Sequence, residues 1–128
     1  MHEKDFQTAF NKWLKYQDQY YGAFELKLTH EPSLPFSAVS AHQVRNLDNV
    51  RNSHLIYKIS DEGFGQKPFD CFKLQNYPAY VVIMFYRRGQ KTFYMIDINT
   101  WIDHVLGSKR KSITELEASE IGYTCKLA

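Results

Sequence analysis

Glu25 and Lys27 stand two residues apart in the short apolar segment Phe24–Leu28. In a β-strand alternate side chains point to the same face, so Glu25 and Lys27 share one face and the apolar residues take the other. Such a pair is costly inside an apolar strand unless function requires it. Metal-assisted phosphodiester hydrolysis uses one: the carboxylate holds Mg²⁺, and the lysine orients the attacking water or stabilises charge on the phosphate. A half-exposed strand edge can carry the same pattern with no chemistry, so Glu-x-Lys alone does not distinguish a catalytic site from an ordinary surface pair.

Three further polar residues occur where such a site would need them. Gln43 falls on the helix expected after this strand, Asp70 stands between Phe69 and Cys71, and Glu3 opens the first helix. Each has an ordinary interpretation: a polar helix flank, a turn residue bonded to a neighbouring amide, and a first-turn acid favoured by the helix dipole. Among aromatic and thiol neighbours, however, the Asp70 carboxylate would be costly without a cation or donors.

Length and composition predict one domain that spans residues 1–128. The chain has 44% hydrophobic and 16% aromatic residues and a formal net charge of +2, which suit a globular core but not a strongly basic nucleic-acid binder. No segment has the length of a membrane span, and the first residues lack the apolar run of a signal peptide. Two widely separated cysteines indicate reduced thiols, so a cytoplasmic location without a membrane partner is expected.

Periodicity and capping signals predict alternating helices and strands. Helices are expected over residues 3–17, from a Ser37 cap to about Val50, and over 101–106 after an Asn99 or Thr100 cap. Ser112 and Glu115 resemble a capping box, so residues 106–128 are expected to form a helical tail. Strands are expected over residues 23–29, 54–60, 69–74, 79–86 and 92–98.

The order of these elements indicates an α/β fold in which a central mixed β-sheet is flanked by helices. The segment from Ala79 to Tyr86 is a nearly continuous apolar run, which is typical of a central strand that is buried on both faces. Residues 92–98 are its expected hairpin partner.

The sequence resembles the PD-(D/E)xK nuclease superfamily in the order of four features. These are Glu25-x-Lys27, a loop, the helix segment that ends at His42-Gln43, and Asp70 after Pro68. The similarity is closest to Holliday-junction resolvases of the RecU type. It implies a restriction-endonuclease-like fold and an Mg²⁺-dependent DNA endonuclease in which Mn²⁺ can substitute. It also implies branched DNA as a substrate and a homodimer that cuts two strands symmetrically.

The resemblance further implies roles for individual residues. Glu25 and Asp70, with the Leu26 carbonyl, would hold the metal ion, while Lys27 would stabilise charge or orient the nucleophile and Gln43 would position it. The superfamily usually places its Asp before Glu-x-Lys, whereas Asp70 comes after it, so the two halves of the site are expected to have exchanged chain order. Further candidates are Glu3 near the metal, Lys58 at the phosphate, and Lys67, Lys73, Arg87 and Arg88 along the DNA backbone.

Two other classes of function remain open at this stage. A nuclease-fold module that has lost catalysis would bind DNA without cleaving it. A small structural or partner-binding protein would use its aromatic surface and would show neither stabilisation by divalent cations nor salt-dependent DNA affinity. Convergence of Asp70, Glu25 and Lys27 on one site would distinguish the enzyme from both.

Overall fold

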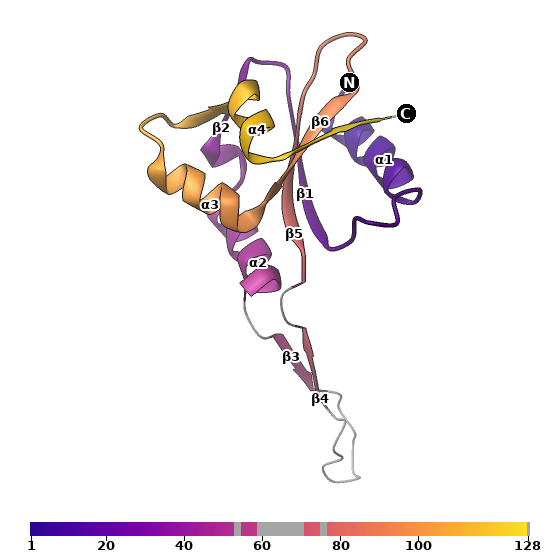
Figure 1. Ribbon diagram of the computed structural model, residues 1–128, viewed down its shortest axis with the longest axis vertical. Coiled ribbons are helices and arrows are strands. Elements are labelled where there is room, and N and C mark those ends of the chain that lie inside the picture. Colours follow the sequence, from indigo (N-terminus) through magenta and orange to yellow (C-terminus); the bar gives the residue numbers. More distant parts are fainter. Residues whose placement is uncertain (53–54, 59–70, 75–76, 128) are drawn as a thin grey trace.

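A mixed four-stranded sheet forms the centre of the protein, as the computed structural model shows for residues 1–52, 55–58, 71–74 and 77–127 (Figure 1). Its strand order is β1-β5-β6-β8, with β1 parallel to β5 and the other neighbours antiparallel. These strands are β1 (Ala23–Thr29), β5 (Ala79–Phe85), β6 (Thr92–Asp97) and β8 (Tyr123–Lys126). Two smaller antiparallel pairs join β2 (Ser33–Pro35) to β7 (Ser112–Thr114) and β3 (Leu55–Lys58) to β4 (Cys71–Leu74).

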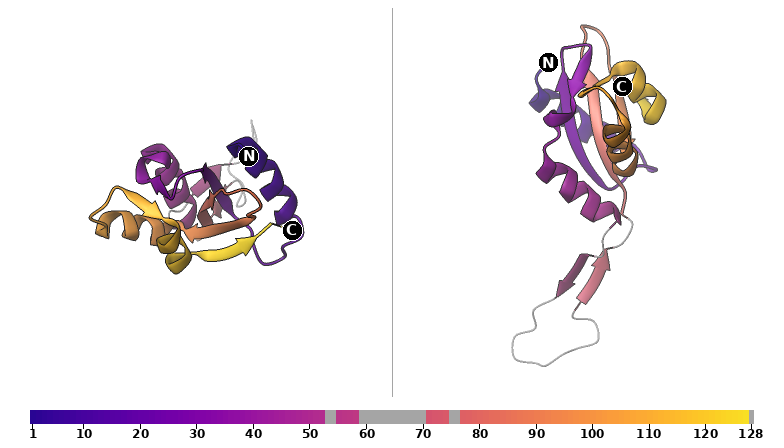
Figure 2. Two further views of the ribbon diagram at one scale, coloured as in Figure 1. Left: turned by 90° about the horizontal axis from the view of Figure 1, so that it is seen from above. Right: turned by 90° about the vertical axis from the view of Figure 1, so that its left-hand side faces the viewer.

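Helices cover both faces of this sheet and give three layers (Figure 2). On one face, α1 (Glu3–Leu14) buries Phe6 and Phe10 against the sheet. The opposite face carries the short 3₁₀ helix η1 (Phe36–Ala38), α2 (Ala41–Asn52), α3 (Ile98–Gly107) and α4 (Glu115–Ile121). The α/β fold with a mixed sheet flanked by helices is therefore confirmed.

β5 is the central strand that the apolar run predicts. Its residues from Val81 to Phe85 are all buried, because helices cover both faces of the strand. Gly22 fixes how β1 enters beside it: its φ is +131°, and a Cβ there would stand 2.1 Å from the carbonyl oxygen of Pro78. The next amide, that of Ala23, donates to the same carbonyl oxygen and begins the parallel pairing.

The predicted Ser37 cap is wrong. Residues 36–38 form η1, and α2 begins only at Ala41, after Ser40. Val39 accounts for the difference: it is buried in the core and adopts an extended backbone, so it separates the two helical turns. The helix therefore starts three residues later than its first serine suggests, and a second serine caps it.

The C-terminal prediction also needs correction. Asp97, rather than Asn99 or Thr100, caps α3, because its Oδ1 accepts a hydrogen bond from the backbone N–H of Asn99 at 2.8 Å. Thr114, rather than Ser112, caps α4. Residues 106–128 are not a helical tail, since they contain β7 and β8 on either side of the short helix α4. Both strands are held by pairing with distant segments, which local periodicity does not report.

The β3–β4 pair extends away from the three layers, beyond the end of α2 (Figures 1 and 2). Within the described ranges, no helix combines the length and apolar character needed to cross a lipid bilayer. Cys125 carries a free thiol, and burial raises its pKa.

Candidate functional site

Glu25 and Lys27 lie side by side on the β1 face that turns towards α2. Phe24, Leu26 and Leu28 of β1 pack in the cluster under α1. Because side chains alternate along a strand, Glu25 and Lys27 lie on the other face of β1. Lys27 Nζ lies 3.4 Å from Glu25 Oε1, and the side chains are 13% and 29% exposed, respectively. The pair is therefore largely withdrawn from water.

Gln43 completes a chain of contacts with this pair. Its Nε2 donates to Glu25 Oε1 at 2.8 Å, although the two residues are 18 positions apart. At the other end of the amide, Gln43 Oε1 accepts from the backbone N–H of Ser40 at 3.0 Å, and the Ser40 hydroxyl accepts from the backbone N–H of Gln43 at 3.2 Å. These reciprocal bonds are a capping box at the start of α2.

β1 has an open side within the described part of the sheet, because it stands first in the strand order. On the β5 side, the N–H of Ala23 donates to the carbonyl oxygen of Pro78, and the carbonyl oxygen of Thr29 accepts from the N–H of Tyr86. The N–H of Leu28 points the other way and donates to Glu3 Oε2 at 3.4 Å. Peptide groups of alternate residues point to alternate sides of a strand, so the carbonyl of Leu26 faces the open side as well. Glu3 and the Leu26 carbonyl therefore lie along one edge.

Two oxygen atoms near this pair are of the kind that could bind a hard cation. Mg²⁺ prefers oxygen ligands and usually binds one or two carboxylates together with water and phosphate. Glu25 Oε2 receives no hydrogen bond from the described residues, and the Leu26 carbonyl is directed to the open edge. The described residues contain no group of three or more His, Cys, Asp or Glu side chains that could hold a metal ion. The second carboxylate that the resemblance implies, Asp70, lies outside the described residues.

The residues predicted to contact the DNA backbone belong to other segments of the chain. Lys67 lies outside the described residues, and Lys58 and Lys73 fall at β3–β4 register positions opposite Cys71 and Ile56. Arg87 and Arg88 follow β5 at the end opposite Glu25. Glu25 is in register with Val81, and Arg87 comes six residues after Val81, of which the first four continue β5 to Phe85. An extended chain of that length spans roughly 20 Å.

Arg87 already has internal partners. Its guanidinium contacts Gln90 Oε1 at 3.2 Å and Glu115 Oε1 at 2.5 Å. The hydroxyl of Tyr94 donates to Glu115 Oε2 at 2.8 Å, and burial together with this bond raises the pKa of Tyr94 to about 12. The cluster ties the β5–β6 turn to the first turn of α4, while Arg88 is exposed.

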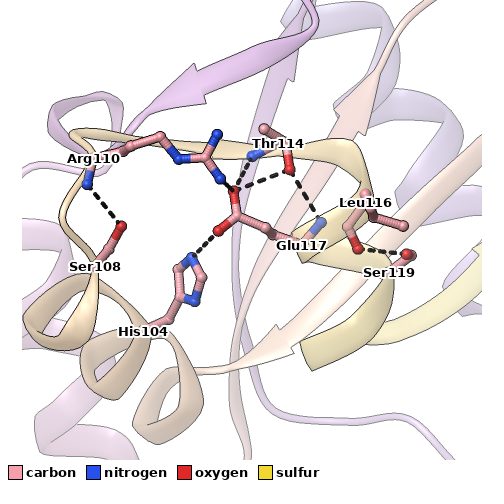
Figure 3. A network of polar contacts seen from close by, with 7 residues as sticks. All are labelled: His104, Ser108, Arg110, Thr114, Leu116, Glu117 and Ser119. Carbon is pink, nitrogen blue, oxygen red and sulfur yellow. Dashed lines mark hydrogen bonds and ion pairs between the residues drawn. The ribbon is translucent and has the colours of Figure 1, made fainter.

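A second capping box lies at α4 and involves Glu117 (Figure 3). Glu117 Oε1 accepts from the backbone N–H and hydroxyl of Thr114, both at 3.0 Å, and from Arg110 at 3.1 Å. Its Oε2 stands 3.3 Å from Nε2 of His104, and this buried nitrogen makes no hydrogen bond in the described structure. The backbone bond from Thr114 is the main reason why the pKa of Glu117 is lowered.

A cavity of about 320 Å³ lies on the opposite face of the sheet, beside α1. Its walls include Ala9, Lys12, Trp13, Tyr16 and Leu127. It does not include Glu25 or Lys27, so it is separate from the candidate site.

Ser40 is the residue of this site that the sequence reasoning did not identify. Its signal was present in the segment Ser40-Ala41-His42-Gln43, which has the serine and glutamine spacing of a capping box. The predicted helix start was placed at Ser37 instead, because this serine comes first in the sequence.

Searches with this chain found no matching protein-family model, curated protein or solved structure.

Proposed function

We propose that this protein is a divalent-metal-dependent DNA endonuclease that hydrolyses phosphodiester bonds. The observation that carries the proposal is the arrangement around Glu25. A hydrogen bond from Gln43 and an ion pair with Lys27 hold its Oε1, while Oε2 and the nearby Leu26 carbonyl are left for a hard cation. A merely structural ion pair needs neither a third residue from a helix nor an edge strand with an open side.

In this mechanism Glu25 Oε2, the Leu26 carbonyl and Asp70 would hold Mg²⁺ or Mn²⁺. When bound, the cation supplies a water of lowered pKa and offsets charge on the phosphate. Gln43 keeps the carboxylate in one rotamer, and Lys27 places an ammonium where negative charge develops on the phosphate. Glu3 lies further along the same edge and can accept a hydrogen bond from a water at the site.

The substrate and assembly follow from the resemblance to RecU-type resolvases. It favours branched DNA such as a four-way junction, a restriction-endonuclease-like fold, a homodimer and a cytoplasmic location. Lys58, Lys67, Lys73 and Arg88 are the proposed contacts to the DNA backbone, with Arg87 as a further one if it exchanges its internal partners for phosphate.

The test is cleavage of linear, nicked, forked and four-way DNA of one sequence in Mn²⁺, with EDTA as the reference. The expected result is cutting that requires the metal ion and is lost in Asp70→Asn, with DNA affinity retained. Lys27→Ala should lower the rate by roughly 100-fold or more with little change in affinity. Undiminished cutting in EDTA, or full activity of Asp70→Asn, would contradict the metal mechanism.

A DNA-binding module without catalysis is the second candidate. It is favoured by one observation: the described ranges contain no group of three or more His, Cys, Asp or Glu side chains that could hold a metal ion. This candidate predicts salt-dependent DNA binding by the wild type, no cleavage on any of the four substrates, and no effect of Asp70→Asn.

A further inference from the structure

Ser40 connects the start of α2 to the carboxylate of the candidate site. Its hydroxyl holds the backbone N–H of Gln43, and its own N–H holds the side-chain oxygen of Gln43, at 3.2 and 3.0 Å. Its carbonyl accepts the first helical bond, from the backbone N–H of Val44 at 2.9 Å. Three bonds thus fix where residue 40 stands relative to the side chain of Gln43.

The chemistry of these partners allows only one orientation of the Gln43 amide. A backbone N–H can only donate, so the amide end that faces Ser40 must be the oxygen. An ionised carboxylate can only accept, so the end that faces Glu25 must be the NH₂ group. A glutamine amide can often be turned by 180° with no clear loss, but here a turned amide would oppose donor to donor and acceptor to acceptor.

The fixed amide has a direct effect on Glu25. Gln43 Nε2 and Lys27 Nζ both approach Oε1, at 2.8 and 3.4 Å. This oxygen therefore accepts one hydrogen bond and pairs with one ammonium group, and both contacts restrict the rotation of the carboxylate. Oε2 is the oxygen left to meet a cation, so the cap also determines which atom of Glu25 serves as the ligand.

We propose that Ser40 is a positioning residue of the candidate site. By holding the Gln43 amide in one orientation, it directs the NH₂ group to Oε1 of Glu25 and reserves Oε2 for a divalent cation. The part that concerns the cation rests on the proposed function. The part that concerns the amide does not, because these hydrogen bonds form without metal.

The chain offers a matched control in Thr114, which caps α4 by the same reciprocal pattern. Ser40→Ala and Thr114→Ala each remove one capping hydroxyl and should destabilise their helices similarly. Ser40→Thr keeps a capping hydroxyl. An effect seen in Ser40→Ala but not in Thr114→Ala or Ser40→Thr therefore comes from the position of the Gln43 amide and not from a general loss of helix stability.

The first measurement is hydrogen exchange of the Gln43 side-chain amide, followed by NMR without metal. In the wild type and in Ser40→Thr and Thr114→Ala, exchange should be roughly tenfold slower than at Gln7, which is exposed. In Ser40→Ala it should move towards the Gln7 rate, because residue 40 loses its hydroxyl bond to the backbone N–H of Gln43, which is one of the three bonds that fix its place. Exchange in Ser40→Ala that matches the wild type would overturn the proposal, as would an equal acceleration in Thr114→Ala.

The second measurement is Mn²⁺ affinity by calorimetry on the same four proteins. Ser40→Ala should bind Mn²⁺ roughly three to ten times more weakly than the wild type, with Ser40→Thr and Thr114→Ala unchanged. A wild type that binds no Mn²⁺ and cuts no DNA would end the proposed function, and the exchange experiment would still decide the role of Ser40. Mn²⁺ binding that is equal in all four proteins would show that the cap does not control the ligand atom.

Discussion

The capping boxes at the start of α2 and of α4 have the same geometry but lead to different surroundings. At α2 and at α4 alike, the N-cap N–H lies 3.0 Å from the side-chain oxygen of the third helical residue, and the N-cap hydroxyl lies 3.2 Å from that residue's N–H. The third residue is Gln43 in one helix and Glu117 in the other. What differs is the atom left over once the box is formed.

That leftover atom determines what each helix start can contact. Gln43 is left with an NH₂ group, which donates to the carboxylate of Glu25. Glu117 is left with an oxygen, which faces the imidazole of His104. The α4 box is thereby closed within its own neighbourhood, as Figure 3 shows, whereas the α2 box reaches a carboxylate on an edge strand. An amide in place of a carboxylate thus converts a structural cap into part of a candidate site.

The largest expected effect contrasts the two carboxylates themselves. Glu25→Gln should lower metal-dependent DNA cleavage by about 1,000-fold or more, because it removes a charged metal ligand while keeping the shape of the side chain. Glu117→Gln should leave the rate unchanged at a temperature where both proteins are folded. Rates measured in Mn²⁺ under single-turnover conditions check this, and equal losses in both variants would remove the distinction.

Truncating the third helical residue separates function from stability. Gln43→Ala should lower cleavage by roughly 10- to 100-fold, since Glu25 loses the donor that orients it. Glu117→Ala should lower the free energy of unfolding by about 1–2 kcal/mol and leave cleavage intact. Urea unfolding and cleavage rates on the same preparations provide the comparison. The distinction fails if Gln43→Ala cuts DNA at the wild-type rate.

Acid should weaken the α4 box in a way that depends on Glu117. The folded-state pKa of Glu117 is lowered from its ordinary value of 4.5, so its stabilising contribution is complete above that pH and is lost as the pH falls through the folded value. Unfolding free energies measured from pH 7 to pH 3 should therefore decline less steeply in Glu117→Gln than in the wild type. Parallel curves for the two proteins would contradict this linkage.

The smallest effect is expected at the exposed cation of the α4 box. Arg110 is 64% exposed where it pairs with Glu117, so Arg110→Ala should change the unfolding free energy by only about 0–1 kcal/mol. The difference should shrink further in high salt. Thermal or urea unfolding at two salt concentrations checks this. A loss well above that range would mean that the network acts as a unit, and the α4 box would then be more than a local cap.

Elements with a strong local pattern were predictable from the sequence. The apolar run of β5 and the stripe of α1 gave the right elements, because periodicity reports directly which face a residue buries. β7 and β8 were missed since they are short and exist only through pairing with distant strands. The Ser37 cap was wrong because two serines compete within four positions, and core packing of Val39 selects the second.

The sequence by itself determined the parts of the candidate site: a carboxylate and an ammonium on one strand face, and a serine and glutamine at the spacing of a capping box. Only the tertiary structure decided that the amide of Gln43 meets Glu25 across 18 positions and that the Leu26 carbonyl faces an open edge. The physical reason is range. Periods and caps act within a few residues, whereas the docking of a helix on a strand depends on how the whole core packs.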